Sequence, residues 1–145
     1  MYKKILLAYD GSETGQRALL DCHEIAQWSH AELRLIAVMQ LPVSNLTLEG
    51  SLYDNTLQET EEARYQTILD TGLRTLHDTG LTAQGEVVIG DAVTEITRCA
   101  SSIQADLIVV GHKHQSGWAA RWWSGSVSKA LIEHAPCSVL VVITH

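Results

Sequence analysis

Short apolar runs alternate along the chain with longer segments in which apolar residues recur at every third or fourth position. The segment after residue 12 is of the second kind, with one apolar helical face formed by Ala18, Leu19, Cys22, Ile25 and Ala26. This spacing predicts an amphipathic helix. Similar spacing predicts helices over residues 56–80, after residue 91, and from about residue 125.

The short apolar runs predict five strands, which are "KKILLAY", "ELRLIAVM", "AQGEVVIG", "ADLIVVG" and "CSVLVVIT". Runs with almost no polar interruption suit a sheet that is covered on both faces. The alternation of strands and helices therefore predicts an α/β fold with a parallel, doubly wound sheet and helices on both faces. No repeat or linker interrupts the pattern, so we expect residues 1–145 to form a single domain.

Several residues mark the expected helix ends. Ser12 and Asp91 are suited to capping the helices that follow them, and Gly80 is suited to ending the long helix before it. Residues 41–55 are rich in turn formers and are expected to form a loop. The long helix is expected to turn a set of apolar residues inward, namely Leu57, Tyr65, Ile68, Leu69 and Leu76.

Composition narrows the classes of partner. The formal net charge of −7 argues against binding to nucleic acid or to an anionic membrane surface, because both attract basic proteins. The apolar run at the N-terminus spans only about six residues, too few for a signal peptide. No run reaches the about 18 residues of a membrane span. We expect a cytoplasmic protein whose cysteines, Cys22, Cys99 and Cys137, are mainly core residues.

A phosphate site is suggested where the fourth strand ends and the next helix begins. Gly111 ends the strand, and the run from Gly125 to Ser128 opens the helix. A helix N-terminus presents free N–H groups and partial positive charge, which attract anions. If the strand order reverses between the first and fourth strands, the loops after Asp10 and Gly111 face one crevice. The pattern matches neither a P-loop nor GxGxxG, so an ordinary helix start is the alternative.

The chain as a whole resembles the universal stress protein family. The segments that carry the resemblance are "KKILLAYDGSE", "LRLIAV", "ADLIVVG" and "GSVSKALIEHAPCSVLVV". The resemblance implies a five-stranded parallel sheet of order 3-2-1-4-5 with four helices, similar to adenine nucleotide alpha hydrolases. It also implies a homodimer that forms through the C-terminal strand, residues 138–143. An unknown protein partner would follow from a role in the stress response.

The resemblance further implies an adenine-nucleotide site for ATP, ADP or AMP, with Mg²⁺ held through the phosphates. Asp10 and Val38 would contact the nucleoside, and Gly111 and Gly125 would flank the phosphates. The full set of implied site residues is Ala8, Asp10, Val38, Gly111, His112, His114, Gly125, Ser126, Val127 and Ser128.

The chain departs from the family's glycine pattern in two ways. His114 stands where a second glycine is expected, and ten residues, 115–124, separate it from Gly125 instead of nine. If that position requires a positive φ, a residue other than glycine costs about 1–2 kcal/mol. Gly117 could compensate, or His114 could donate a hydrogen bond to a phosphate.

Other functions stay open from the residues alone. The loop over residues 112–124 carries Trp118, Trp122 and Trp123, a composition typical of docking surfaces. The alternative is therefore a nucleotide-free dimeric interaction protein. His112 and His114 lack the further ligands that a dedicated metal site requires. No nucleophile–base pair has a recognisable spacing, so any enzymatic activity is expected to be at most slow ATP hydrolysis.

Overall fold

The computed structural model describes residues 1–40, 51–113 and 126–144, with the side chains of 51–56, 113 and 126 left out. Five parallel strands form one sheet in the order β3-β2-β1-β4-β5, as predicted. The strands are β1 (Lys4–Ala8), β2 (Glu32–Met39), β3 (Gln84–Ile89), β4 (Leu107–Lys113) and β5 (Ser138–Thr144). The helices in the described residues are α1 (Glu13–Ser29), α2 (Ser51–Asp78), α3 (Ala92–Ile103) and α5 (Ser126–His134).

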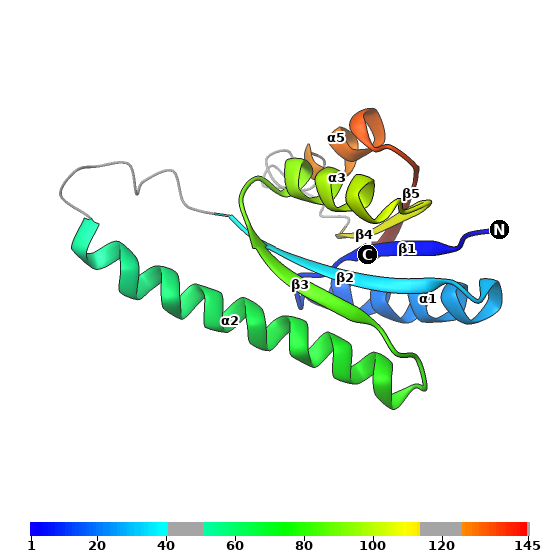
Figure 1. Cartoon of the computed structure of the whole chain (residues 1–145), viewed down its shortest axis with the longest axis horizontal. Helices are drawn as coiled ribbons and strands as arrows, with labels where there is room; N and C mark the ends of the chain where they lie inside the picture. Colours follow the sequence, from blue (N-terminus) through cyan, green and yellow to red (C-terminus); the bar gives the residue numbers. More distant parts are fainter. Residues whose placement is uncertain (41–50, 114–125, 145) are drawn as a thin grey trace.

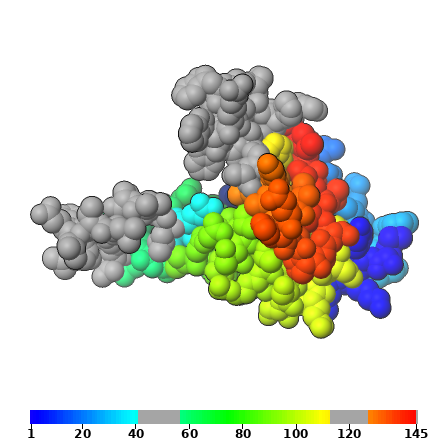
Figure 2. Space-filling view, turned by 90° about the horizontal axis from the view of Figure 1, so that it is seen from above, coloured from blue at the N-terminus to red at the C-terminus, as the bar shows by residue number. Residues whose placement is uncertain are grey.

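The helices form two layers around the sheet. Helices α1 and α2 cover one face, and α3 and α5 cover the other (Figure 1). Alternate residues of β4 divide between the two faces: Leu107 and Val109 pack toward α1 and α2, whereas Ile108 and Val110 pack toward α3 and α5. Figure 2 looks onto the second face, with α5 (orange) between α3 (yellow-green) and β5 (red). The apolar strands predicted from the sequence are therefore covered on both sides.

The direction of winding reverses beside β1. β1 pairs with β2 on one side, with Lys4 opposite Glu32, and with β4 on the other, with Ile5 opposite Leu107. The chain leaves β1 toward β2 and β3 before it crosses back to β4. The connections that follow β1 and β4 thus diverge, and a crevice opens between them at the carboxyl ends of the strands.

The predicted helix ends are confirmed. The Ser12 hydroxyl accepts a hydrogen bond from the Gly15 N–H at 3.0 Å, and the Asp91 carboxylate accepts one from the Thr94 N–H at 3.0 Å. These bonds satisfy N–H groups that a helix start leaves without partners. Gly80 adopts a φ of +88° just after α2, which is the backbone conformation expected of a glycine that ends a helix.

Helix α2 is longer than the sequence indicated. It begins at Ser51, so residues 51–55 are helical and not part of a loop; residues 41–50 lie outside the described part of the chain. The prediction that Leu57 faces the core is wrong, because its side chain is 62% exposed. The N-terminal part of α2, to which Leu57 belongs, extends past the sheet (Figure 1), so none of the described strands lies opposite Leu57.

Two glycines set the short distance between α2 and the sheet. A Cβ atom at Gly72 would lie 2.7 Å from Tyr9 Cε1, and one at Gly85 of β3 would lie 2.8 Å from Leu69 Cδ1. Contacts this short do not occur between real side chains, so any larger residue would push α2 outward. The position of α2 over the sheet therefore depends on the absence of a side chain at both positions.

Replacing Gly72 by alanine tests this dependence. Helix propensity alone would stabilise the variant by about 1 kcal/mol. We expect the clash with Tyr9 to outweigh this gain, since overpacking of a core costs about 1–3 kcal/mol, and to lower the free energy of unfolding in urea. Thr67→Ala, on the exposed side of the same helix, is the control and should be neutral or stabilising. A stabilised Gly72→Ala variant would contradict the close packing.

Candidate functional site

A cavity of about 450 Å³ lies at the carboxyl edge of the sheet, where the winding reverses. This volume falls within the about 300–1,000 Å³ that is typical of small-molecule sites. Strands β1, β2 and β4 and the first turns of α3 and α5 contribute to its wall. We call it the carboxyl-edge cavity.

The structure brings together most of the site residues predicted from the sequence. The predicted residues that line the carboxyl-edge cavity are Ala8, Asp10, Val38, Gly111, His112, Val127 and Ser128. Ser126 begins α5, but its side chain is outside the described part. His114, Gly125 and the tryptophans 118, 122 and 123 also lie outside the described residues. The contribution of each residue to ligand binding stays a prediction.

Asp10 takes part in a hydrogen-bonded turn between β1 and α1. Its Oδ1 atom accepts from the Ser12 N–H at 2.9 Å and from the Ser12 hydroxyl at 2.6 Å. Gly15 makes room for this carboxylate, because a Cβ atom there would lie 2.7 Å from Oδ1. Both hydrogen bonds use Oδ1, so the turn does not require Oδ2. Asp10 can hold the turn and also present an acceptor to the cavity.

Gly111 has a structural role that the sequence did not reveal. A Cβ atom at Gly111 would lie 2.8 Å from both the carbonyl oxygen and the Cγ2 atom of Thr14. The first turn of α1 therefore packs directly on the backbone of β4. Thr14 itself is buried, and its hydroxyl is hydrogen-bonded at 3.0 Å to that of Thr144 in β5. The glycine that was interpreted as one side of a phosphate site is also the contact that joins α1, β4 and β5.

The charges around the cavity limit what can hold an anion. The described residues that line it include Asp10 and His112 but no lysine or arginine. Within the described part of the chain, the helix N-termini at the cavity are the remaining source of positive potential. Asp91 already caps α3, and the hydrogen bonds it accepts from Thr94 lower the pKa of its carboxyl, which keeps a negative charge at that end. Among the helices of the described part that reach the cavity, α5 is thus the better candidate for an anion site.

Sequence reasoning missed several residues of the cavity wall, including two tyrosines. Tyr9 is 2% exposed, its hydroxyl accepts a hydrogen bond from Gln16, and burial beside Asp10 raises the pKa of its phenol. Tyr65 of α2 is only partly buried. Helical spacing indicated that Tyr65 faces inward, but it could not show that this part of α2 lies over the edge of the sheet. The other lining residues that were missed are Gly15, Ile36, Gln40, Ala92, Ile96 and Val110.

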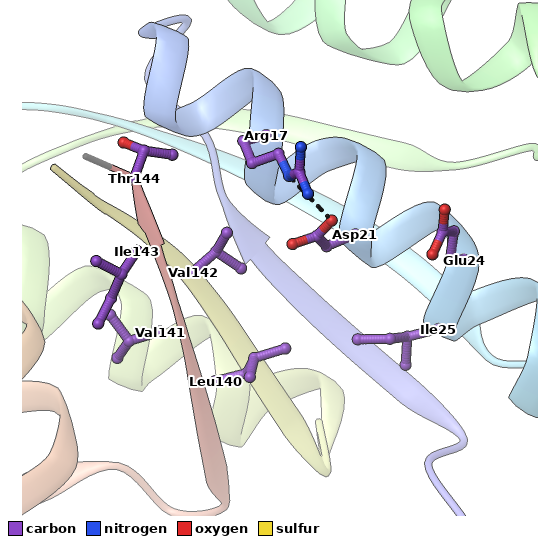
Figure 3. Close-up of a pocket in the computed structure, with 9 residues that line it drawn as sticks. All are labelled: Arg17, Asp21, Glu24, Ile25, Leu140, Val141, Val142, Ile143 and Thr144. Atoms are coloured by element: carbon purple, nitrogen blue, oxygen red, sulfur yellow. Dashed lines mark ion pairs between the residues drawn. The ribbon is translucent and has the colours of Figure 1, made fainter.

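A second hollow of about 660 Å³ lies between α1 and the edge strand β5. Figure 3 shows Arg17, Asp21 and Glu24 of α1 on one side, with Leu140 and Val142 of β5 facing them. The hollow is larger than the carboxyl-edge cavity but runs along an open sheet edge. None of the predicted site residues within the described part lines it, and the Arg17–Asp21 ion pair, at 3.4 Å, lies exposed at its rim. The carboxyl-edge cavity is therefore the stronger candidate for a small-molecule site.

Burial makes Cys22 and Cys99 weak nucleophiles at neutral pH. Burial raises the pKa of Cys22 to about 12, and burial together with the nearby Glu86 carboxylate raises that of Cys99 to about 11. Both side chains are buried, as the helical pattern predicted. Within residues 1–40, 51–113 and 126–144, no group of three or more histidines, cysteines and carboxylates could hold a metal ion. No helix of the described part is both long and apolar enough for a membrane span.

The strand order and the position of the cavity define a doubly wound α/β fold of the kind that binds ligands where its winding reverses. The sequence model of the universal stress protein family matches residues 1–142. A universal stress protein of Methanocaldococcus jannaschii is 32% identical over 143 residues, which cover 98% of this chain and 82% of the relative. The chain belongs to the universal stress protein family.

Solved structures share the fold. Universal stress protein UspA of Lactobacillus plantarum superposes with a TM-score of 0.81 at 24% identity, over 97% of each chain. A universal stress protein described in complex with cAMP has a TM-score of 0.72 at 24% identity, over 99% and 98% of the chains. A family protein of Arabidopsis thaliana with AMP bound has a TM-score of 0.71 at 19% identity, over 99% of this chain and 92% of the other.

The packing role of Gly111 predicts a loss of stability that needs no ligand. In Gly111→Ala, the new methyl group meets the Thr14 backbone, which cannot rotate away, so we expect unfolding to become easier by about 1–3 kcal/mol. Gly80→Ala is the comparison, since nothing lies within 4 Å of its Cβ and only the positive φ is strained, at about 1–2 kcal/mol. Urea unfolding of the ligand-free proteins measures both. Equal stability of Gly111→Ala and the unchanged protein would show that α1 does not need the glycine.

Proposed function

We propose that this universal stress protein binds an adenine nucleotide in the carboxyl-edge cavity and acts as a regulatory protein of the cytoplasmic stress response. The observation that carries the proposal is the gathering of residues from β1, β2, β4 and α5 around one cavity of suitable size. The described complexes of similar proteins with cAMP and AMP support the choice of ligand class. Binding would alter the surface around the cavity and so its contact with a protein partner.

The two ends of the cavity suit the two ends of a nucleotide. Near β2 the wall is apolar, with Ile36 and Val38, and suits a base. Near α5, Val127 and Ser128 belong to the first turn of the helix, whose N–H groups suit phosphates. Asp10 follows β1, which lies between β2 and β4 in the sheet. Its carboxylate suits the ribose hydroxyls.

The charge of the cavity wall affects how many phosphate groups a bound nucleotide is expected to carry. A triphosphate brings several negative charges to a wall whose described residues include no lysine or arginine, and the N-terminus of α5 offsets only part of this charge. Mg²⁺ bound to the phosphates would offset part of this charge. With Mg²⁺ offsetting this charge, we propose ATP as the leading ligand because the family resemblance implies it, with ADP and AMP as the less charged alternatives.

Filling the cavity tests the proposed binding. Isothermal titration with Mg²⁺-ATP should show binding to the unchanged protein and at least a tenfold loss in Ala92→Trp, whose new side chain would occupy the cavity. Ala63→Trp, on the exposed side of α2, makes the same change elsewhere and should bind as before. Absence of heat and of any thermal shift with millimolar ATP, ADP, AMP and cAMP would refute the proposal.

We also propose a homodimer through β5, supported by the contrast between the two sheet edges. The edge strand β3 exposes Gln84 and Glu86, and charged residues on an edge discourage pairing. The edge strand β5 has an apolar run, and Ile143 is 54% exposed. An uncovered apolar edge favours pairing with the same strand of a second copy.

A lysine substitution on each edge strand tests which edge of the sheet forms the dimer. In sedimentation at micromolar concentration, the unchanged protein should be dimeric and Ile143→Lys should shift toward monomer, since the dimer would bury the new charge. Ile89→Lys makes the same change on the opposite edge and should leave the dimer intact. A monomeric unchanged protein would rule out the proposed dimer.

A further inference from the structure

Tyr65 of α2 lines the carboxyl-edge cavity, although its position in the sequence is far from the strand ends that build the rest of the site. We propose that the Tyr65 ring packs against the base of the bound nucleotide and makes the site favour ligands that carry a base. This inference rests on the proposed nucleotide binding and adds a specificity-determining residue to it.

The contacts of α2 fix where Tyr65 lies. Gly72 packs against the Tyr9 ring, as described above, and Ile68 packs against the turn after β1, where a Cβ atom at Gly11 would lie 2.9 Å from Ile68 Cγ2. Tyr65 precedes Gly72 by seven residues, close to two full helical turns, so both lie on nearly the same side of α2. Tyr65 lies about one helical turn before Ile68 in the chain. It is therefore placed beyond the β1–α1 connection that contains Asp10, at the carboxyl edge of the sheet.

The Tyr65 ring is supported on one face. The Arg64 guanidinium lies over the ring, with Cζ 5.1 Å from its centroid, and donates a hydrogen bond to the Glu61 carboxylate at 3.1 Å. Arg64 does not itself line the cavity. A ligand in the cavity can therefore meet only the opposite face or the edge of the ring. Because the Arg64 cation already holds one face of the Tyr65 ring, the ring loses less conformational entropy when a ligand binds.

Tyr65 belongs to the apolar end of the cavity and not to the anion end. α2 packs on β2 and β3, so Tyr65 reaches that end from the α1 and α2 side of the sheet, whereas Ile36 and Val38 reach it from the α3 and α5 side. β1 separates β2 from β4, which places the two ends about 10 Å apart at the usual strand spacing. A base that lies across the carboxyl edge of β2 can therefore meet the aromatic ring from one side of the sheet and the aliphatic side chains from the other. Tyr9, the other tyrosine of the wall, is buried in the core and held by Gln16, so it is less free to adapt to a ligand.

The experiment compares a ligand that has a base with one that lacks it. Isothermal titrations use Mg²⁺-ATP and Mg²⁺-tripolyphosphate with the full chain and with Tyr65→Ala, Tyr65→Phe and Tyr2→Ala. Base–aromatic stacking predicts that Tyr65→Ala weakens ATP binding by about tenfold or more, while tripolyphosphate binding stays unchanged. Tyr65→Phe keeps the ring and should bind ATP within about twofold of the unchanged protein. Tyr2→Ala removes a partly buried tyrosine that precedes β1, at the opposite end of the sheet, and should bind both ligands normally.

Each other outcome overturns a definite part of the proposal. Unchanged ATP affinity in Tyr65→Ala would show that the ring does not contact the base, with the proposed function intact. Equal losses for ATP and tripolyphosphate would show that Tyr65 supports only the fold of the site. If tripolyphosphate binds too weakly to titrate, the ATP affinities of Tyr65→Phe and Tyr65→Ala are compared instead. A loss of ATP affinity in both variants would overturn the role of the ring. Failure of the unchanged protein to bind ATP, ADP, AMP or cAMP would remove the proposed function and this inference together.

Discussion

The parallel pairing of β1 with β4 is the constraint on which the rest of the structure depends. It places two strands side by side whose following connections lead in opposite directions, toward β2 and toward β5. Right-handed crossovers then assign α1 and α2 to one face and α3 and α5 to the other. The space between the diverging connections is the carboxyl-edge cavity, which is therefore a consequence of strand order more than of any single side chain.

Close helix packing gives this cavity its shape. Gly11, Gly15, Gly72 and Gly111 each lie where a Cβ atom would come within 2.9 Å of a neighbouring atom. Through these contacts α1 approaches the backbone of β4 and α2 approaches the turn after β1. Glycines near the cavity thus serve the fold as well as any ligand, and their presence alone does not distinguish a phosphate site from a packing requirement. The helix N-terminus of α5 and the apolar end near β2 are the features that point to a nucleotide.

The sequence was sufficient to predict features that follow from the periodicity of apolar residues. It was not sufficient for features that depend on which element lies across from a given residue in the fold. Alternating strand and helix patterns were enough for the doubly wound parallel sheet and its two helical layers, whereas the strand order, on which the meeting of Asp10 with Gly111 depends, came from the resemblance to the universal stress protein family. The same helical pattern misplaced Leu57, because it cannot show where the sheet ends beneath α2. It turned Tyr65 inward correctly, since that side chain packs against the core, but it could not show that Tyr65 also lines the cavity. The contact between Gly111 and Thr14 joins residues distant in the sequence, and no local signal marks it.

The most direct test of the account is to locate ATP on the protein by backbone NMR. Titration with Mg²⁺-ATP should shift the amide signals of residues around the carboxyl-edge cavity, such as Asp10, Gly111 and Ser128. The hollow between α1 and β5 is larger, and its residues Asp21 and Leu140 should keep their signals unchanged. Shifts confined to that hollow, or no shifts at all, would contradict the claim that the reversal of winding at β1 and β4 creates the nucleotide site.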